Sequence, residues 1–488
     1  MINHGLCSRR HLLEMSAYGL GGIAASMLLK DDVAFAAESA NLAKPELEPQ
    51  SFDLNVKPSL RPAKAKAMIS MFMIGGPSQI DMFDPKPELN KRDGQDFSGE
   101  LQYDNAAQAS RKLMKSMATF QPRGDCGMEM SDLIPHMGEI ADDITLIRSM
   151  HTGVNNHLPS MFALNTGEGV QGRATLGAWL LKSLGCESQE LPAYVALTHP
   201  SGMPLMGGEC WSNGGLPSIF QGTVVRPREP RILNLDPPNF MVGEPQRKQL
   251  DLISQFNANH LAEHPGENDL EARIASYQLA AKMQLAAKEA FDISGETQET
   301  LDLYGVGDEK TRDYATRCLI ARRLVERGVR FVQIFNNGQS WDHHDSILTA
   351  LPERCAEIDK PAAALVKDLK RIGLLDSTLV HWGGEMGRLP VIQIPAGEDG
   401  LKKVGRDHNT YGFSMWLAGG GVRGGYVHGK TDEFAHHAVE DIVTHHDYLA
   451  TVLHLFGLDP TAMKFRSGAR DLSLLTSDQA KVVKQLLS

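Results

Sequence analysis

The stretch AMISMFMIGGP, residues 67–77, decides the fold class. It is a nearly continuous apolar run that ends in a Gly-Gly-Pro turn. Because its apolar character is continuous and not alternating, the run predicts a buried strand of a parallel sheet that is covered on both faces. Open α/β sheets bind ligands beyond the carboxyl ends of their strands. The loop after this strand is therefore a candidate site, and it contains Asp81 and Asp84.

Similar apolar runs recur along the chain and alternate with helical patterns. Further strands are expected at residues 144–150, 193–197, 329–335, 377–382 and 413–418. Helices are expected at residues 133–141, 160–167, 175–184, 247–260, 269–291, 312–327, 361–374 and 447–456. Strands that alternate with helices predict one α/β sheet with helices on both faces. Residues 86–125 are polar and predict a mobile excursion, and the Gly- and Pro-rich residues 201–245 predict an inserted lid or an edge region.

Composition narrows the class of protein. The chain has 488 residues, a formal net charge of −11, 42% hydrophobic and 22% charged residues, which is typical of a soluble globular protein. The negative charge and the lack of a basic stretch argue against nucleic-acid binding. Apart from the N-terminal run, no stretch approaches the roughly 18 apolar residues of a membrane span. Six scattered cysteines favour free thiols over a bridge between Cys186 and Cys210.

The N-terminus has the layout of an export signal. Arg9 and Arg10 precede a mild Gly/Ala-rich apolar run, and the small-x-small sequence at residues 34–36 resembles a cleavage site. We expect a twin-arginine-type signal peptide at residues 1–36, a linker at 37–62, and a single domain at 63–480 with an insertion at about 201–310. The translocation machinery would then be a partner, and the protein would be periplasmic or secreted. The alternative for residues 1–36 is a lone amphipathic helix.

Histidines and carboxylates gather in the last third of the chain. Ten of the eighteen histidines lie between His343 and His454, with several carboxylates among them. Imidazole and carboxylate together are ligands that Zn²⁺, Mn²⁺ or Fe²⁺ prefers. Because no spacing in this region matches a short zinc motif such as His-Glu-x-x-His, a metal site must be assembled from several loops.

Two predicted strands deliver the strongest candidate ligands. Asp342 and His344 follow the strand at 329–335 and are two residues apart, so both can face the same edge of the sheet; the alternative is a solvated turn. Glu385 follows the strand at 377–382. A carboxylate buried there needs a cation, which is either a metal ion or Arg388.

The remaining candidates leave more alternatives open. Asp407 and His408 follow a Gly-rich polar loop and are candidate metal ligands. Either Asp81 or Asp84 is a candidate ligand from the first strand, although Asp84-Pro85 is also a common turn. Arg388 is a candidate clamp for a phosphate or sulfate group, and its alternative role is a buried ion pair.

Five segments together resemble the DUF1501 family, an exported branch of the alkaline phosphatase/sulfatase superfamily. They are GGPSQIDMFDPKP (75–87), WDHH (341–344), GEMGR (384–388), GRDH (405–408) and LAGGGVRGG (417–425). The resemblance implies an alkaline-phosphatase-like three-layer α/β/α sandwich: a mostly parallel central sheet, helices on both faces, and an inserted lid or helical region. It also implies a divalent metal ion (Zn, Mn, Fe or Ca) and a small-molecule or glycan ester as substrate.

One departure from the superfamily concerns the nucleophile. HLPSMFALNTG (157–167) is similar to the sulfatase signature, with Pro-Ser and Thr-Gly in register, but His157 stands at the Ser/Cys nucleophile position. His157 and Arg388 are therefore the candidate catalytic residues, and attack by water is the simpler mechanism. We expect an exported metal-dependent hydrolase of phosphate or sulfate esters. The alternative is a non-catalytic exported binding or cell-surface protein that retains the fold.

Overall fold

The computed structural model describes residues 53–488 except 105–107, 109, 233–234, 236–237, 265–267, 396–401, 468–469 and 478. The predicted signal peptide at 1–36 and most of the predicted linker at 37–62 lie outside the described residues. Among the helices that are described, none is both long enough and apolar enough to cross a membrane.

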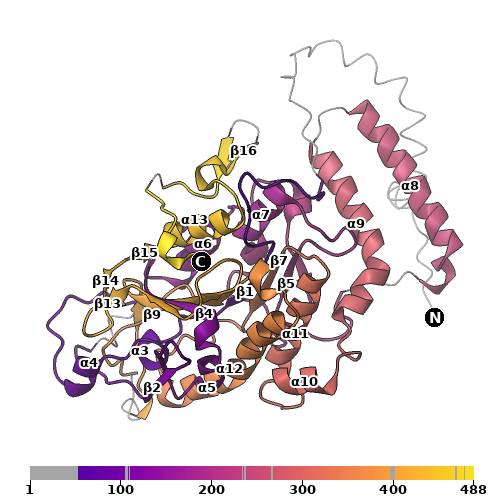
Figure 1. Cartoon of the computed structure of the whole chain (residues 1–488). Helices are drawn as coiled ribbons and strands as arrows, with labels where there is room; N and C mark the ends of the chain where they lie inside the picture. Colours follow the sequence, from indigo (N-terminus) through magenta and orange to yellow (C-terminus); the bar gives the residue numbers. More distant parts are fainter. Residues whose placement is uncertain are drawn as a thin grey trace, which may run out of the picture. The chain divides into compact units, whose positions relative to one another are not determined.

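A nine-stranded sheet forms the centre of the fold (Figure 1). Its strands are β1 (Ala67–Phe72), β4 (Ile144–His151), β5 (Tyr194–Leu197), β6 (Thr223–Val225), β7 (Phe331–Phe335), β8 (Thr378–Gly383), β11 (Phe413–Ala418), β12 (Tyr426–His428) and β15 (Val443–Thr444). They are ordered β12-β4-β11-β8-β1-β7-β5-β6, and β15 lies beside β4. β11 pairs antiparallel with β4 and β8, and the other pairings recorded for this sheet are parallel.

Helices cover both faces of the sheet, as Figure 1 shows. One face carries α5 (Pro135–Gly138), α10 (Gln298–Tyr304), α11 (Arg312–Glu326) and α12 (Ile347–Arg371). The other carries α6 (His157–Thr166), α7 (Leu176–Leu184) and α13 (His445–Leu455). Side chains alternate across β1, so that Ile69 and Met71 enter the first core and Met68 and Phe72 the second. The predicted three-layer α/β/α architecture with a mostly parallel sheet is confirmed.

Apart from short 3-10 turns, further helices and strands are present among the described residues. They are α3 (Gln79–Met82), α4 (Pro87–Lys91), β2 (Phe120–Arg123), β3 (Met128–Ser131), α8 (Glu244–Glu263), α9 (Asn268–Phe291), β9 (Gly387–Arg388), β10 (His408–Asn409), β13 (Lys430–Thr431), β14 (Ala438–Glu440), β16 (Lys464–Ser467) and β17 (Arg470–Ser473). Within the predicted lid or edge region, β6 is the edge strand of the sheet.

Two predictions about local structure were wrong. Residues 86–125 are not a free excursion, because Leu89, Phe97 and Leu113 are buried in a small core of their own with Leu389. The helix predicted at 361–374 begins at Ile347 and continues through Pro361. The apolar side chains of α12 recur every three or four residues and are buried against the sheet, and this packing outweighs the local effect of proline. The preference for free thiols is confirmed for Cys186 and Cys210.

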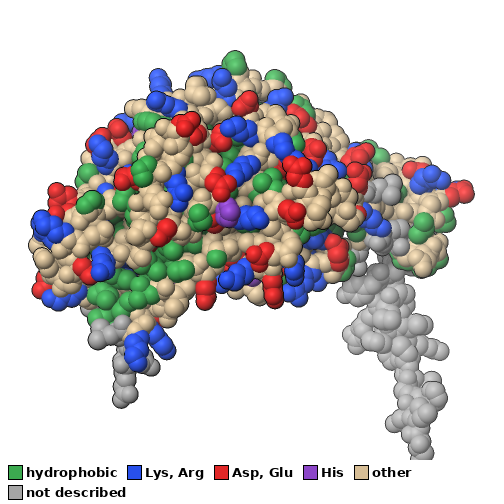
Figure 2. Space-filling model, turned by 60° about the horizontal axis from the view of Figure 1, so that its bottom comes forward, with side chains coloured by type: hydrophobic (Ala, Val, Ile, Leu, Met, Phe, Trp, Pro, Cys, Tyr) green, Lys and Arg blue, Asp and Glu red, His purple; other side chains and the backbone are tan. Residues whose placement is uncertain are grey.

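The surface is charged, and exposed apolar side chains gather in and around α8 and α9. Acidic and basic side chains are interspersed on the face drawn in Figure 2. Six large apolar side chains that are more than a third exposed fall between residues 240 and 277, in and around α8 and α9. Exposed apolar residues that are scattered singly are ordinary, but a group of them indicates a surface that binds something.

Candidate metal centre

The candidate site lies where several parallel strands end. Asp342 and His344 follow β7, and Glu385 follows β8. His157 is in the first turn of α6, which follows β4. His408 lies in β10, opposite Arg388 of β9. Because β4, β7 and β8 point the same way in the sheet, their carboxyl ends bring segments far apart in the sequence to one edge.

Local structure fixes how His157 is presented. The Asn156 side chain accepts a hydrogen bond from the backbone N–H of Leu158 and so caps the start of α6. The helix ends at Gly167, whose φ of 83° is in the left-handed region. α6 is therefore held at both ends, and its first residue points toward the loop that carries Asp342.

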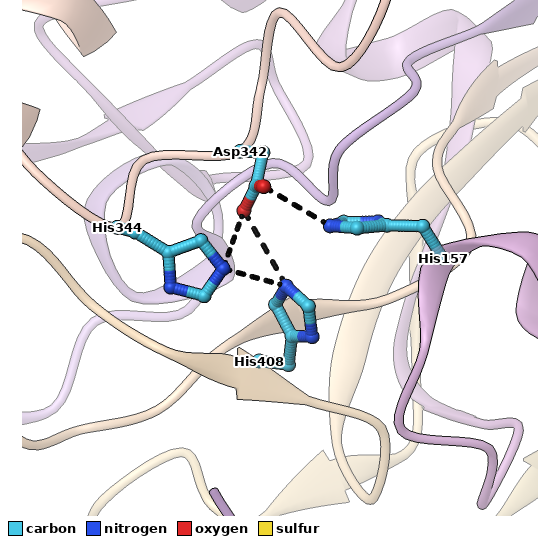
Figure 3. A group of neighbouring side chains, drawn as sticks. All are labelled: His157, Asp342, His344 and His408. Atoms are coloured by element: carbon cyan, nitrogen blue, oxygen red, sulfur yellow. Dashed lines mark hydrogen bonds and ion pairs between the residues drawn. The ribbon is translucent and has the colours of Figure 1, made fainter. Parts of the chain in front are cut away.

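Four side chains converge on one point (Figure 3). Asp342 Oδ1 lies 3.1 Å from His344 Nε2 and 3.4 Å from His408 Nε2, and Asp342 Oδ2 lies 3.2 Å from His157 Nε2. The two nitrogens His344 Nε2 and His408 Nε2 are 3.0 Å apart. One donor atom of each residue lies within 4.8 Å of the others. We call these four residues the histidine–aspartate cluster.

The opposite ring nitrogens show which nitrogen of each imidazole is available to a ligand. His157 Nδ1 is 2.6 Å from Glu385 Oε1, and His344 Nδ1 is 2.8 Å from Gln393 Oε1. A hydrogen bond from Nδ1–H to such an acceptor leaves the Nε2 lone pair directed into the cluster. Basic nitrogens that face one another need a shared proton or a cation between them. Three imidazoles and one carboxylate are a donor set that fits Zn²⁺ and related ions.

Charge in the cluster is balanced by protonation. Burial acts to lower the pKa of His157, but its contacts with Asp342 and Glu385 outweigh burial and raise that pKa to about 9. Burial acts to raise the pKa of Asp342, but the Arg388 charge and the contacts with His157 and His408 hold it far below its ordinary value. Protonated His157 therefore donates to the carboxylates of Asp342 and Glu385, and a divalent ion would displace the proton that faces Asp342.

Arg388 fixes the position of the Asp342 side chain. Its side chain is fully buried; Nη1 is 2.8 Å from Asp342 Oδ1, and Nε donates to the Gly76 carbonyl at 2.9 Å. Its Nη2 has no hydrogen-bond partner among the described residues. Arg388 is thus an ion-pair partner of a cluster residue that retains one unused donor.

Gly75 allows the strand ends to approach. Its backbone N–H donates to Glu385 Oε1 at 2.9 Å, and its φ is +111°. A Cβ at this position would lie 2.4 Å from the backbone nitrogen of Asp342. Glycine is therefore required here both for its conformation and for the space beside the Asp342 loop.

The other candidate ligands lie outside the cluster. Asp81 accepts hydrogen bonds from Ser78 Oγ at 2.6 Å and from the Met117 N–H at 3.0 Å, and its Oδ2 lies 3.1 Å from Arg406 Nε. Asp84 is paired with Lys86 Nζ at 3.0 Å and with the Thr431 hydroxyl. Both carboxylates are buried with partners of their own.

Glu385 and Asp407 are neighbours of the cluster. Glu385 is fully buried and contacts it through His157, while its second oxygen, Oε2, has no partner among the described residues. Asp407 accepts hydrogen bonds from the backbone N–H groups of His408 at 2.7 Å and Asp104 at 3.1 Å, and it lies 3.7 Å from His344 Nδ1.

The sequence did not point to Gln393. It lies in a polar stretch with no motif, and its contact with His344 depends on a segment 49 residues away. The cluster is not sealed: the side chains of Asp342 and His344 are 15% and 25% exposed, whereas those of His157 and His408 are 7% and 1% exposed. Solvent therefore reaches the cluster from the Asp342–His344 side.

Comparison with known families shows to which family the chain belongs. Residues 65–487 match the profile described as a protein of unknown function, DUF1501. The chain belongs to the DUF1501 family. No curated protein matches this DUF1501 chain.

Solved structures similar to this DUF1501 chain include the following three. A protein in the alkaline phosphatase superfamily from Vibrio parahaemolyticus is 12% identical over 86% of this chain and 73% of its own, with a TM-score of 0.36. A sulfatase from Pseudoalteromonas sp. is 15% identical over 73% and 66%, with a TM-score of 0.32. A phosphonate monoester hydrolase from Silicibacter pomeroyi is 11% identical over 72% and 71%, with a TM-score of 0.33. Because these TM-scores are below 0.5, the description of the fold rests on the strand order and register given above.

Proposed function

We propose that this DUF1501 protein is a metal-dependent hydrolase of phosphate or sulfate esters. The observation that carries the proposal is the convergence of three imidazole Nε2 atoms on both oxygens of Asp342. The hydrogen bonds on the Nδ1 side of His157 and His344 support it, because they prepare those rings as ligands. A divalent ion held there would polarise the ester's P=O or S=O oxygen and lower the pKa of a water molecule.

Residues around the cluster orient its members. Glu385 keeps His157 in one tautomer, Gln393 does the same for His344, and Arg388 holds Asp342 in place. His157 stands at the position where the sulfatase signature has its Ser or Cys nucleophile. The proposed reaction therefore transfers the phosphoryl or sulfuryl group directly to water: the ester P–O or S–O bond breaks, the water oxygen replaces the leaving alcohol, and a water proton goes to that alcohol.

A second candidate is a binding protein that holds a metal ion without turnover. It is favoured by the state of Arg388, the candidate anion clamp, which is fully buried and already paired with Asp342. An arginine in this position stabilises the cluster but gives an incoming anion only one unused donor. The same experiment separates the two functions.

The test is metal content combined with hydrolysis. Purified protein is analysed for metals, depleted with a chelator, and assayed on 4-nitrophenyl phosphate and sulfate before and after each divalent ion is returned. We expect about one bound ion that is lost in His344→Ala and kept in His454→Ala, a control at the last turn of α13 and outside the cluster. Activity that follows the metal supports the hydrolase. A bound metal without turnover supports the binding protein, and a protein that binds no metal contradicts both.

We propose further that the protein is exported by the twin-arginine route to the periplasm or beyond. The support is the sequence of residues 1–36, with Arg9 and Arg10 ahead of a weakly apolar run. Replacement of both arginines by lysine should leave the full-length chain in the cytoplasm, whereas the wild-type chain should be recovered outside it in a shortened form. Unchanged export of the double variant would argue against this route.

A further inference from the structure

α8 is a long helix that buries none of its side chains. It has 20 residues, Glu244–Glu263. Its half-exposed side chains lie on the side of α9, and the Gln246 amide donates to Gln284 of that helix. Helical stability in proteins comes mostly from packing an apolar face, so a long helix whose apolar residues remain in water lacks part of its packing.

One line of exposed side chains along α8 has large apolar residues at its centre, and we call this line the seam. Its members are separated alternately by four and three residues and are all exposed: Pro245, Gln249, Leu252, Phe256, Asn259 and Glu263. Leu252 is 50% exposed and Phe256 is 53% exposed, and Ile253 beside them is 41% exposed. Alternating spacings of three and four keep side chains on one line along a helix that pairs with another.

The four central members of the seam have matching chemistry on the two sides of Ser254. Leu252 and Phe256 lie at equal distances on either side of it, and so do Gln249 and Asn259. If two copies of α8 lie antiparallel across a two-fold axis at Ser254, Leu252 meets Phe256 of the other copy, and Gln249 meets Asn259. The apolar centre is then covered by itself, and the flanking amides donate to and accept from each other.

We propose that α8 is the self-association surface of this protein and that its occupant is a second copy of the same chain, paired antiparallel through α8. The helix is about 30 Å long. Phe240 and Val242, just before α8, and Tyr277 of α9 are 78%, 59% and 63% exposed and add to the exposed apolar side chains of this region. A surface that pairs with itself across a two-fold axis gives a closed dimer.

The charge of α8 favours a second copy of the chain over a membrane surface as its partner. Helices that lie on anionic lipid are rich in Lys and Arg on their polar face. α8 contains Arg247 and Lys248 against Glu244, Asp251 and Glu263, so acidic residues outnumber basic ones. The central seam positions from Gln249 to Asn259 carry no charge, as expected for the core of a protein–protein interface.

Sedimentation velocity on the full protein tests the proposal. The buffer contains a chelator, because His260, Glu263 and His264 at the end of α8 lie close enough together to hold a metal ion, and a bound ion could itself link two copies. We expect a dimer at about 100 µM, and single variants Leu252→Lys and Phe256→Glu that raise its dissociation constant at least about tenfold. Leu60→Glu, at another exposed apolar residue, is the matched control and should stay dimeric.

The double variant tests the register. The proposed pairing has two equivalent contacts between position 252 of one copy and position 256 of the other. In the double variant Leu252→Lys with Phe256→Glu, each contact joins a lysine to a glutamate, so part of the lost affinity should be recovered. Because no side chain of α8 is buried, these variants should keep the wild-type circular dichroism spectrum. A wild-type monomer at about 100 µM, or a dimer that neither single variant weakens, overturns the proposal. A double variant no better than the single ones overturns the two-fold at Ser254.

Discussion

Replacement of Glu385 by glutamine tests whether Glu385 orients the ligand His157 or is itself a metal ligand. Glu385 is fully buried, and its Oε1 accepts from His157 Nδ1 at 2.6 Å and from the Gly75 N–H at 2.9 Å. Glutamine keeps the shape and one acceptor oxygen but removes the negative charge that makes His157 a stronger donor to a metal. Loss of such a neighbour commonly lowers metal affinity 10- to 100-fold, or by about 1.4–2.7 kcal/mol.

The assay is competition for the metal with a chromophoric chelator. We expect Glu385→Gln to bind one ion as the wild type does, but with an affinity about 10- to 100-fold lower. Asp368→Asn is the matched control, since Asp368 is also fully buried and is held by Arg322 at 2.9 Å and Arg371 at 2.8 Å on another part of the fold. It should lower the free energy of unfolding and leave the metal affinity unchanged.

Two results would refute this reasoning. An affinity within about twofold of the wild type would mean that Glu385 does not act through His157. Complete loss of the ion at concentrations that saturate the wild type would mean that Glu385 is itself a ligand, through the oxygen Oε2 that has no partner among the described residues.

Three further predictions concern stability. Gly75→Ala should cost about 1–3 kcal/mol and reduce metal content, because its Cβ would lie 2.4 Å from the Asp342 nitrogen; full metal content would contradict the close approach. Asp81→Ala should cost about 3–5 kcal/mol by leaving the buried Arg406 without its carboxylate, yet keep the metal stoichiometry, as urea unfolding and elemental analysis would show. Burial lowers the pKa of His381 to about 3, against about 6.5 in the unfolded chain, so its share of stability is complete above pH 6.5 and falls by about 1.4 kcal/mol per pH unit below it. His381→Gln should therefore flatten the dependence of the unfolding free energy on pH between about pH 6.5 and 5, and an unchanged slope would contradict it.

The layered architecture was predictable because it depends on local pattern. The run at 67–74 is continuous and apolar because β1 lies between β7 and β8 at the centre of the sheet and is covered on both faces. The excursion at 86–125 was mispredicted because its apolar residues are isolated in the sequence. Phe97 and Leu113 find their partners, including Leu389, only in the folded chain.

The candidate site was predictable in part for the same reason. Asp342 and His344 follow a recognisable strand, and His157 stands out in the 157–167 stretch. The sequence left open whether Asp81 or Asp84 is a ligand and did not indicate that Asp81 pairs with Arg406, which is 325 residues away. Pairings between distant segments leave no trace in the spacing of residues.

The distances along the chain within the site have a consequence for how the protein matures. The contacts of His157 with Glu385 and of His344 with His408 join positions 228 and 64 residues apart. An unfolded or half-folded chain does not hold these groups together, so an ion bound by the histidine–aspartate cluster selects the completed sheet and stabilises it by mass action, by about 2.7 kcal/mol at a free concentration 100 times the dissociation constant. Occupancy of the site would then report that folding is finished. If the chain folds before it is exported by the proposed twin-arginine route, the supply of metal in the cytoplasm would set how much protein is ready for export.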